Sequence, residues 1–464
     1  MSSTSLSGAT VAVIGAGTMG TGIAQIAAQA GHRVRLHDAR EGAAADAKAK
    51  LAATLDGLVA KGKLDAAAAS ATLARIEPAR AIAELADAKL VVEAIVENLE
   101  VKRKLFAELE GIVAPDAVLA TNTSSISVTA IARDLKAPQR LVGMHFFNPV
   151  PLMKLVEVVS GLRTERGVAD AIFELSKAWG KVPVHTKSTP GFIVNRIARP
   201  YYAETLALLH EGYVTPEQAD AALRAAGFRM GPCELMDLIG HDVNYAVTES
   251  VYAANYFDKR YVPSLVQREL VDGGLFGRKS GRGFYDYANG APAAKPAASR
   301  RGDVAASAQL VLTDGRTAQQ VAAETRQRDV AVFDWAIGPG GALAYAVAEG
   351  ASEAFAQEVA QAIAAAGFEP LRIGDAPGLV VARTVAMLVN EAADAVQQGV
   401  CDPAAADTAM KLGVNYPAGP FEWLNQVGTA RVVELLGALA AHYGGERYRT
   451  SPWLACRRLQ ERTA

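Results

Sequence analysis

The stretch Thr10-Val-Ala-Val-Ile-Gly15-Ala-Gly17-Thr18-Met19-Gly20 decides the fold of the first part of the chain. A short apolar, β-branched run leads directly into the pattern G-x-G-x-x-G, and a helix rich in small residues follows. In this context Gly15 permits a tight turn, Gly17 lets backbone N–H groups approach a pyrophosphate, and Gly20 allows close helix-to-strand packing. The helix N-terminus then faces the anion. The stretch predicts a Rossmann-type dinucleotide-binding fold with residues 15–20 at the phosphates.

An acidic residue ends the second predicted strand, residues 34–38. Asp38 follows the glycines at about the 20-residue distance at which an acid accepts the ribose hydroxyls and repels a 2'-phosphate. NAD is therefore predicted over NADP. Arg40 keeps NADP open, because an arginine at such a place can bind a 2'-phosphate.

Two further runs, residues 90–95 and 118–121, are predicted as buried strands of the same sheet. In an open α/β sheet, ligands bind beyond the carboxyl ends of the strands. The side chains expected near the cofactor crevice are therefore Glu97, Lys102, Asn122, Ser124 and Ser125. For each one alone, a helix cap or a turn hydrogen bond is the alternative interpretation. Glu97 is interpreted as the start of a charged helix.

The chain between Asp38 and residue 90 is interpreted as a long alanine-rich helix. Thr54 and Lys61 lie two turns apart on it and so share a face. Lys61 is either a contact to a phosphorylated substrate tail or an ordinary solvated lysine.

Composition excludes several classes of protein. The 464 residues, 50% of them hydrophobic, suffice for two to four domains. Lys plus Arg at 47 nearly balances Asp plus Glu at 49, so no basic field is available for nucleic acid. Cys233, Cys401 and Cys456 are widely spaced, which argues against a disulfide framework or a zinc site. Without a signal peptide or a long apolar stretch, the chain is expected to be cytoplasmic, with no membrane and no metal.

A histidine and a glutamate interrupt two apolar runs, residues 141–146 and 155–159, which the turn Asn148-Pro149-Val150-Pro151 joins. A buried, ionised carboxylate is costly when alone, so Glu157 needs a partner or a purpose. Antiparallel strands joined in this way can bring His145 within hydrogen-bond reach of Glu157. That contact fixes the tautomer of the imidazole and suits general acid–base catalysis. A structural pair in the core is the alternative.

Three segments follow one another along the chain: TNTSSIS at 121–127, GMHFFNPVPLMKLVEVV at 143–159 and TPGFIVNRI at 189–197. They resemble the 3-hydroxyacyl-CoA dehydrogenases of fatty-acid and aromatic-acid β-oxidation, and the resemblance covers residues 11–287. It implies reversible, NAD-dependent oxidation of an (S)-3-hydroxyacyl-CoA to the 3-oxoacyl-CoA. It further implies that His145 is the general base, that Glu157 orients it, and that Ser124 and Asn195 contact the hydroxyl and thioester region of the substrate.

The same resemblance implies a set of binding residues. Besides the glycine loop, those implied for NAD are Asp38, Glu97, Lys102, Ser124, Asn148 and Lys279. Those implied for the CoA moiety are Thr54, Lys61 and Ser124. Two other readings stay open. One is a dehydrogenase of a free hydroxy acid or sugar acid, and the other is a catalytically silent dinucleotide-binding structural protein.

The second part of the chain repeats the first helical part. Residues 187 onward predict a helical domain in which Pro190-Gly191 and Asn195-Arg196 recur as Pro377-Gly378 and Ala382-Arg383, while Glu204 recurs as Glu391. Such a repeat indicates duplication. Because Ala382 has no group to hold a substrate oxygen, the second copy is interpreted as architectural.

The predicted architecture is α/β and has five parts. They are an NAD-binding Rossmann-type domain at 1–186, a helical domain at 187–287, an Ala/Pro/Ser-rich linker at 288–307, a small α/β domain or decayed dinucleotide fold at 308–374, and a second helical copy at 375–464. The resemblance implies pairing through the helical domain. We therefore expect either a homodimer or a monomer with an internal pseudo-dimer.

Tandem helical domains resemble the bacterial branch of the family. That branch acts on 3-hydroxyadipyl-CoA, in phenylacetate-type aromatic degradation, or on 3-hydroxybutyryl-CoA. No motif defines the acyl length. A terminal carboxylate on the substrate would need a positive partner, for which Arg196, Arg199 and Arg229 are the candidates.

Overall fold

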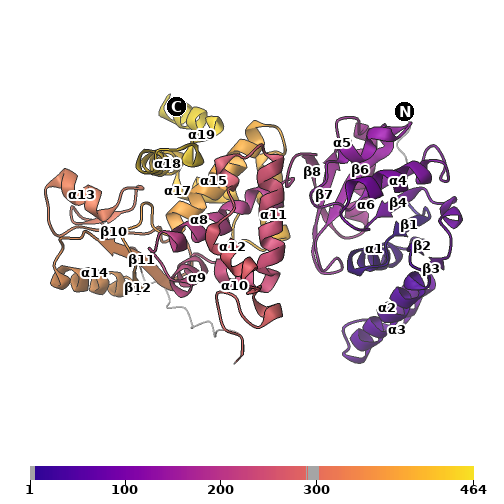
Figure 1. Cartoon of the computed structure of the whole chain (residues 1–464), viewed down its shortest axis with the longest axis horizontal. Coiled ribbons are helices and arrows are strands. Elements are labelled where there is room, and N and C mark those ends of the chain that lie inside the picture. The colour runs from indigo at the N-terminus through magenta and orange to yellow at the C-terminus, as the bar shows by residue number, and fades with distance from the viewer. Residues whose placement is uncertain (1–5, 289, 291–301, 464) are drawn as a thin grey trace. The chain divides into compact units, whose positions relative to one another are not determined.

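The computed structural model describes residues 6–288, 290 and 302–463 (Figure 1). They form two compact units, Met1–Ile193 with Gly399–Gly413, and Val194–Gln398 with Val414–Ala464. Within the predicted linker, residues 289 and 291–301 lie outside the described residues. None of the described helices combines the length and the apolar character that crossing a membrane requires.

An eight-stranded sheet forms the centre of the first unit, in the order β3-β2-β1-β4-β5-β6-β7-β8. All neighbouring strands are parallel except β6 and β7. Because the strand order reverses between β1 and β4, a ligand crevice is expected at their carboxyl ends. The strands are β1 Val11–Ile14, β2 Val34–His37, β3 Ile76–Ala79, β4 Leu90–Glu93, β5 Val118–Thr121, β6 Leu141–Phe146, β7 Leu155–Ser160 and β8 Val182–Lys187.

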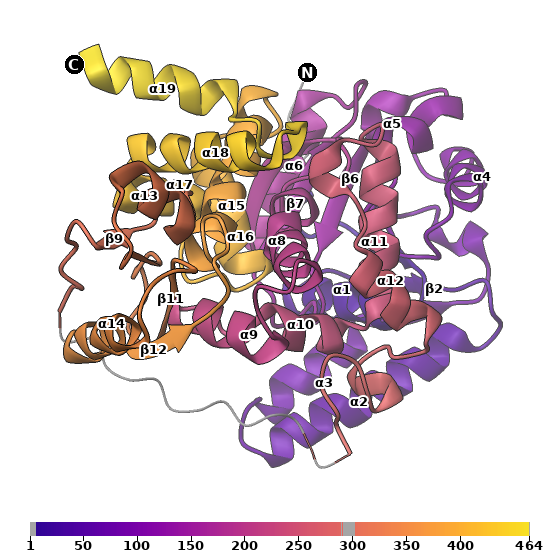
Figure 2. The same ribbon diagram turned by 60° about the vertical axis from the view of Figure 1, so that its left-hand side comes forward.

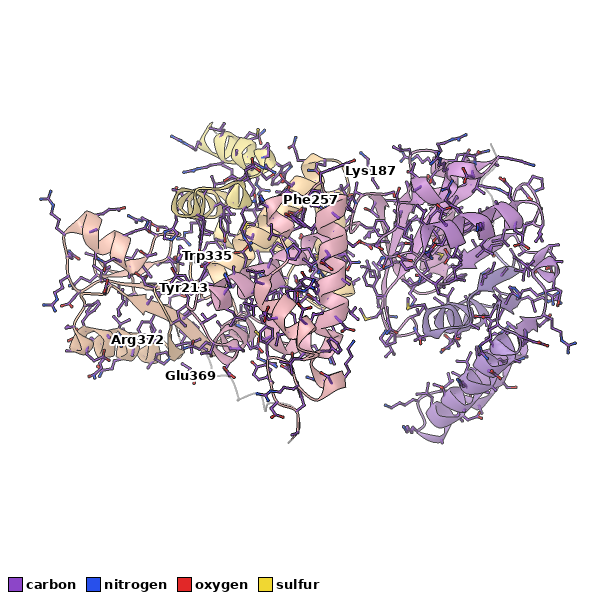
Figure 3. The ribbon with its side chains drawn as sticks, in the orientation of Figure 1. Lys187, Tyr213, Phe257, Trp335, Glu369 and Arg372 are labelled. Atoms are coloured by element: carbon purple, nitrogen blue, oxygen red, sulfur yellow. The ribbon has the colours of Figure 1, made fainter. Side chains whose placement is uncertain are left out.

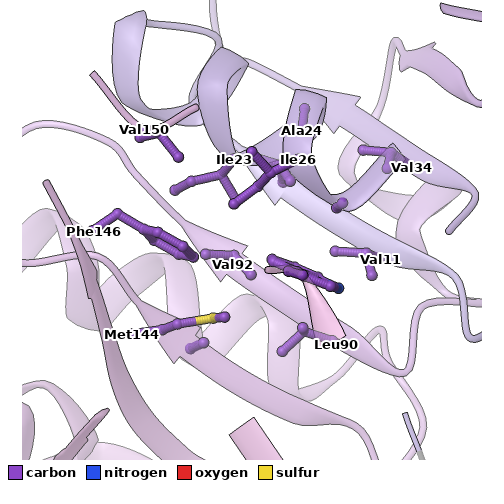
Figure 4. Close-up of a cluster of buried hydrophobic side chains, with 14 of the residues drawn as sticks. Val11, Ile23, Ala24, Ile26, Val34, Leu90, Val92, Met144, Phe146 and Val150 are labelled. Atoms are coloured by element: carbon purple, nitrogen blue, oxygen red, sulfur yellow. The ribbon is translucent and has the colours of Figure 1, made fainter. Parts of the chain in front are cut away.

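Helices cover both faces of this sheet, which explains why its strands are nearly continuous apolar runs. Along β1, Val11 and Val13 face one core and Ala12 and Ile14 face the other, because successive side chains alternate between faces. Figure 4 shows the first core, where side chains of the glycine-loop helix pack on β1 and β4. The helices are α1 Thr18–Gln29, α2 Ala43–Ala60, α3 Ala66–Ala74, α4 Leu99–Glu110, α5 Val128–Ile131, α6 Arg166–Ala178 and α16 Pro403–Gly413.

The long alanine-rich helix predicted between Asp38 and residue 90 is present as α2, but it does not fill the interval. The chain forms α2, α3 and the edge strand β3, and Figure 1 shows α2 and α3 side by side. Gly62, with φ +65°, ends α2, and the Asp65 carboxylate accepts a hydrogen bond from Ala68 N to start α3. Pro78 within β3 lacks an N–H, which a strand tolerates at a sheet edge. That proline is why the strand was missed.

The second unit combines the two helical copies with a four-stranded sheet of order β12-β11-β10-β9. Its pairs run parallel, antiparallel and parallel from β9 to β12, as do those from β5 to β8. The small sheet therefore repeats the last four strands of the large one. Figure 2 shows α14 beside this sheet, and Figure 3 labels Trp335, whose indole N–H donates to the Thr313 carbonyl at 3.3 Å.

Three of these four strands match the predicted runs, while β11 was not predicted, since its alanine-rich sequence has low strand propensity. The strands are β9 Leu310–Leu312, β10 Ala331–Phe333, β11 Ala342–Val347 and β12 Glu369–Arg372. The helices of the unit are α7 Val194–Ile197, α8 Arg199–His210, α9 Pro216–Ala225, α10 Pro232–Ile239, α11 His241–Ala254, α12 Leu265–Asp272, α13 Ala318–Thr325, α14 Glu353–Ala365, α15 Val381–Gln397, α17 Pro420–Val427, α18 Thr429–Tyr443 and α19 Pro452–Thr463.

The two helical copies pair through reciprocal buried ion pairs. Arg196 Nε lies 2.6 Å from Glu391 Oε1, and Arg383 Nε lies 2.7 Å from Glu204 Oε2. Arg383 is the repeat of Arg196 and Glu391 is the repeat of Glu204, so each copy supplies the same residue to the other. Helices α8 and α15, which carry most of these groups, pack together. This reciprocity is the pattern of an isologous interface between two subunits.

Candidate active site

His145 and Glu157 face each other on adjacent antiparallel strands, β6 and β7. The Nδ1 atom of His145 lies 2.6 Å from Glu157 Oε2. A carboxylate can only accept, so Nδ1 carries the proton and donates it, which leaves the lone pair on Nε2. Nε2 makes no hydrogen bond to the residues that the structure describes. The predicted contact is present, and its geometry can support proton removal at Nε2.

Glu157 is fully buried and holds more than the imidazole. Its Oε1 atom accepts a hydrogen bond from Ile193 N at 2.9 Å, at the end of the first unit. Phe147 and Phe192 lie against the imidazole, with ring centroids 4.6 and 5.7 Å away. The two aromatic rings shield the sides of the imidazole from water. The Glu157 carboxylate, which is itself held by its hydrogen bond from Ile193 N, prevents the imidazole from rotating.

The glycine loop between β1 and α1 leaves an open approach to a helix N-terminus. A Cβ at Gly15 would lie 2.4 Å from the Ala94 carbonyl oxygen, and one at Gly20 would lie 1.7 Å from the Gly15 carbonyl oxygen. At Gly17, by contrast, an added Cβ would meet no described atom within 4 Å. Gly17 is the N-cap of α1, and no side chain of the described residues caps it. The first N–H groups of α1 are therefore available to an anion, so the loop fits a pyrophosphate.

Asp38 lies directly beside this loop. Its Oδ2 atom accepts a hydrogen bond from Ala16 N at 2.8 Å, and Oδ1 accepts one from Arg40 N at 2.9 Å. The side chain of Arg40 is largely exposed and lies 3.4 Å from Asp46. The carboxylate of Asp38 is thus held beside the glycine loop, and Arg40 already has an acidic partner. Both observations favour NAD over NADP.

Asp38→Ser is expected to lower the ratio of kcat/KM for NAD to that for NADP by about tenfold or more, because the change removes both the ribose acceptor and the repelling charge. Initial rates with each cofactor measure this ratio. Asp56→Ser, which alters an exposed carboxylate on α2, serves as the matched control and should leave the ratio unchanged. An unaltered ratio in Asp38→Ser would exclude this carboxylate from cofactor selection.

Glu97 organises the segment that follows β5. Its Oε1 atom accepts hydrogen bonds from Thr123 Oγ1 at 2.6 Å, Ser124 N at 2.9 Å and Ser125 N at 3.1 Å. Burial alone would raise the pKa of the Glu97 carboxyl, but the hydrogen bond from Thr123 and the charge of Lys102 outweigh it, so the pKa lies below its usual value. The expectation that Glu97 opens a helix is wrong, because Asn98 caps α4 and accepts from Val101 N.

Sequence reasoning missed Glu93, the last residue of β4. Glu93 is fully buried, and its Oε1 atom lies 2.5 Å from Lys102 Nζ, which also lies 3.3 Å from Glu97. Thr121 Oγ1 donates to the other oxygen of Glu93 at 2.7 Å. The sequence does indicate Glu93, because this glutamate interrupts an apolar strand in the same way as Glu157 does. Lys102 thus lies between a buried acid, Glu93, and an exposed one, Glu97, at the carboxyl end of the sheet.

The remaining candidates lie in varied surroundings. The side chain of Asn122 accepts from Phe146 N at 2.8 Å and so ties β5 to β6. Asn148 is exposed in the turn after β6, Thr54 is exposed on α2, and Lys61 is the exposed C-cap of that helix. Asn195 and Lys279 belong to the second unit, where Lys279 Nζ lies 2.5 Å from Asp242. The structure thus forms three groups of the predicted residues. The first is the glycine loop with Asp38, the second is the set around Glu97, and the third is the His145–Glu157 pair.

A Rossmann-type sheet with an open glycine loop, an oriented ribose acceptor and a carboxylate-bound histidine defines an NAD-dependent oxidoreductase. Residues 10–189 match the 3-hydroxyacyl-CoA dehydrogenase NAD binding domain, and residues 191–287 and 378–461 match the C-terminal domain of 3-hydroxyacyl-CoA dehydrogenase. Residues 310–377 match the 3-hydroxybutyryl-CoA dehydrogenase reduced Rossmann-fold domain.

Two relatives and one solved structure show how far the similarity extends. The chain is 48% identical to a 3-hydroxyadipyl-CoA dehydrogenase of Escherichia coli (strain K12), over 97% of this chain and 98% of that one. It is 42% identical to a 3-hydroxybutyryl-CoA dehydrogenase of Clostridioides difficile, over 60% of this chain and 99% of that one. A crystal structure of 3-hydroxybutyryl-CoA dehydrogenase from Escherichia coli K12 matches with a TM-score of 0.92 and 47% identity, covering 98% of this chain and 99% of that one. The chain belongs to the 3-hydroxyacyl-CoA dehydrogenase family.

Proposed function

We propose that this enzyme oxidises (S)-3-hydroxyadipyl-CoA or 3-hydroxybutyryl-CoA to the 3-oxoacyl-CoA, and catalyses the reverse reaction. The observation that carries the proposal is the buried His145–Glu157 hydrogen bond, 2.6 Å long, with Nε2 free to take a proton. The names of relatives that match nearly the whole chain supply the two acyl groups.

In this proposal His145 Nε2 removes the proton of the C3 hydroxyl, and the electron pair left on oxygen forms the C3 carbonyl. When NAD is bound, its nicotinamide accepts the hydride released from C3. Glu157 accepts the hydrogen bond from Nδ1 and so stabilises the imidazolium that forms when His145 takes the proton. In the reverse direction the same imidazolium returns the proton to the carbonyl oxygen. Ser124 and Asn195 are assigned to the hydroxyl and thioester region.

The binding residues are proposed as follows. The glycine loop holds the pyrophosphate and Asp38 the ribose, with Glu97, Lys102, Ser124, Asn148 and Lys279 as further NAD contacts. Thr54 and Lys61 are proposed to contact the CoA moiety, which their exposure on one helix supports. Protection of Lys61 by CoA against an amine-reactive reagent tests this assignment, and equal labelling with and without CoA would exclude it.

Consumption of NADH with acetoacetyl-CoA, followed by absorbance, tests the proposed reaction. Turnover of the thioester with none of free acetoacetate is expected. Turnover of the free acid in preference to the thioester would replace the proposal by a free hydroxy-acid dehydrogenase. Binding of NADH without turnover of either compound would favour a catalytically silent protein.

We also propose that the chain is a monomer in which the second helical copy takes the place of a partner subunit. The reciprocal pairs Arg196–Glu391 and Arg383–Glu204 support this proposal. So does a further reciprocity, because α9 of the first copy packs on β11 of the small sheet, and α16 of the second copy packs on β7 and β8 of the large one. The relative from Clostridioides difficile aligns over 99% of its own length with only 60% of this chain, which is in keeping with a second copy added here.

Ending the chain at residue 290 is expected to cause association or insolubility. The truncation removes α15 from α8 and leaves Arg196 and Glu204 without the groups that pair with them. Size-exclusion chromatography with light scattering measures the outcome, with the full chain as the monomeric reference. A soluble, monomeric fragment with full activity would refute the internal pseudo-dimer.

We further propose that residues 1–186 bind NAD, residues 187–287 contribute to the substrate site, and residues 375–464 are architectural. The replacement of Asn195 by Ala382 in the second copy supports this division. The small domain at 308–374 is proposed to be a decayed dinucleotide fold, since it repeats the pairing of β5 to β8 without a G-x-G-x-x-G. Binding of NAD by a fragment of residues 302–464 would contradict this assignment of roles to the domains.

A cytoplasmic location is proposed as well. Cys233 and Cys456 are free thiols, which suits a reducing compartment. Recovery of the native protein from an exported fraction of the cell would contradict this location.

A further inference from the structure

A cavity of about 280 Å³ lies in the second unit, between α8, α11 and the segment that leads into α12. Its lining mixes apolar and polar side chains, and it includes a buried guanidinium, that of Arg199, which is 6% exposed. The cavity-lining residues that matter here are Arg199, Tyr202, Leu206, Thr248, Leu265 and Gln267.

Arg199 has no acidic partner among the residues that the structure describes. Its Nε donates to the Asn195 carbonyl at 3.0 Å, one Nη donates to Thr248 Oγ1 at 3.2 Å, and the guanidinium lies over the ring of Tyr202 at 4.9 Å. A guanidinium carries five N–H donors, so donors remain for a ligand. Burial lowers the pKa of Arg199, and no carboxylate opposes this effect. A buried charge of this kind normally has a partner.

The other arginines considered for this role are accounted for differently. Arg196 is paired with Glu391 and also donates to Gln398 at 2.8 Å. Arg229 is exposed on the surface. Of the three candidates, Arg199 alone is both buried and without an acid, within the described part of the chain.

We infer that this cavity binds the terminal carboxylate of a dicarboxylic 3-hydroxyacyl-CoA, with Arg199 as the charged partner. The inference rests on the proposed function and deepens it by selecting the dicarboxylic substrate class. A carboxylate there would complete the bidentate geometry that guanidinium groups favour. Thr248 accepts from Arg199 and donates to the Asn244 carbonyl at 3.0 Å, so it positions the guanidinium.

Arg199 lies close to Asn195, which is assigned to the hydroxyl and thioester region. Asn195 belongs to α7 and Arg199 begins α8, and Arg199 Nε donates to the Asn195 carbonyl at 3.0 Å. In a six-carbon dicarboxylic acyl group, the terminal carboxylate is three bonds beyond C3. A four-carbon acyl group has no terminal carboxylate for the guanidinium to bind.

The other charged groups at the cavity do not compete for this role. Arg447 is bound to Glu204 at 2.8 Å. The Glu211 carboxylate accepts from Tyr443 Oη at 2.6 Å and lies about 18 Å farther along α8, three turns from Arg199. His210 precedes Glu211 at that far end. A carboxylate ligand at Arg199 therefore meets a positive group without an adjacent negative one.

Substrate specificity of the full chain tests the inference. The ratio of kcat/KM for 3-hydroxyadipyl-CoA to that for 3-hydroxyhexanoyl-CoA, which has the same number of carbons and no terminal charge, is expected to fall by about 10- to 100-fold in Arg199→Gln. Arg229→Gln is the matched control and should preserve the wild-type ratio. An equal loss of kcat/KM for both esters in Arg199→Gln would show that Arg199 has only a structural role and would overturn the inference.

A measurement on the unaltered enzyme covers the case in which Arg199→Gln does not fold. The wild-type enzyme is expected to prefer 3-hydroxyadipyl-CoA over its terminal methyl ester by about tenfold or more, because esterification removes the charge and one acceptor. Equal rates for the acid and the methyl ester would overturn the inference while the proposed function stands. Inactivity toward every CoA ester would instead overturn the proposed function and the inference with it.

Discussion

His145→Gln is expected to lower kcat by about 100-fold or more, because glutamine cannot accept and return a proton as imidazole does. Glutamine can still donate to Glu157, so the fold around β6 and β7 should survive. The affinity for NAD is expected to change little, since the glycine loop and Asp38 lie on other strands. Steady-state rates and NADH binding by fluorescence measure the two quantities separately.

His185→Gln is the matched control for that variant. His185 lies on β8 in the same unit, is half exposed, and stacks on Phe173 with ring centroids 4.4 Å apart. Its replacement should leave kcat unchanged. Near-normal turnover in His145→Gln, with NADH bound as tightly as in the wild type, would remove the assignment of His145 as the base.

Glu204→Gln is expected to reduce the free energy of unfolding of the second unit by about 3–5 kcal/mol, the usual cost of leaving a buried charge unpaired. Glu204 is almost fully buried and accepts from Arg383 Nε at 2.7 Å, Arg447 Nη2 at 2.8 Å and Tyr448 Oη at 3.0 Å. Without this carboxylate, Arg383 keeps its hydrogen bonds to the hydroxyls of Tyr443 and Tyr448, and the acid that remains near it is Glu211, at 3.7 Å. Urea unfolding followed by tryptophan fluorescence measures the loss.

Two controls separate this effect from a general loss of charge. Glu249→Gln changes an exposed glutamate of α11 and should cost no more than about 0.5 kcal/mol. The double variant Glu204→Leu/Arg383→Leu should cost less than the two single changes added together, because Arg383 is then not left buried without Glu204. Additive losses would show that the two side chains do not depend on each other.

The effect of Glu204→Gln should also depend on pH. Burial alone would raise the pKa of Glu204, but Arg447 and Arg383 outweigh it and hold the pKa below the usual value of 4.5. The native state therefore binds fewer protons than the unfolded state in this range, so the contribution of Glu204 is present above pH 4.5 and declines as the pH falls. The stability difference between wild type and Glu204→Gln should shrink accordingly at acidic pH.

Local patterns accounted for the parts of the fold that depend on neighbouring residues. Strands 118–121 and 141–146 were predicted with the bounds observed, since each is an apolar run set off by turn residues. The edge strand β3 and the alanine-rich β11 were missed, because their side chains have weak strand preference and pairing with a neighbouring strand decides their conformation.

The candidate site likewise contains residues that local sequence patterns predict and residues that they do not. The glycine loop, Asp38, His145 and Glu157 could be predicted because spacing along one or two strands determines where they point. Glu93 was missed although it carries the same signal as Glu157. Its partner Lys102 comes from a helix, and a strand sequence does not say which helix residue will face it.

By itself the sequence determined a dinucleotide-binding sheet, a duplicated helical domain and an imidazole opposite a carboxylate, because these follow from short-range periodicity and from an internal repeat. Only the tertiary structure decided which charges have partners. Arg196, Arg199 and Arg229 look alike in the sequence, yet one is bound to Glu391, one is buried without an acid, and one is exposed. The physical reason is that the energy of a charge depends on burial and on groups brought to it from distant parts of the chain.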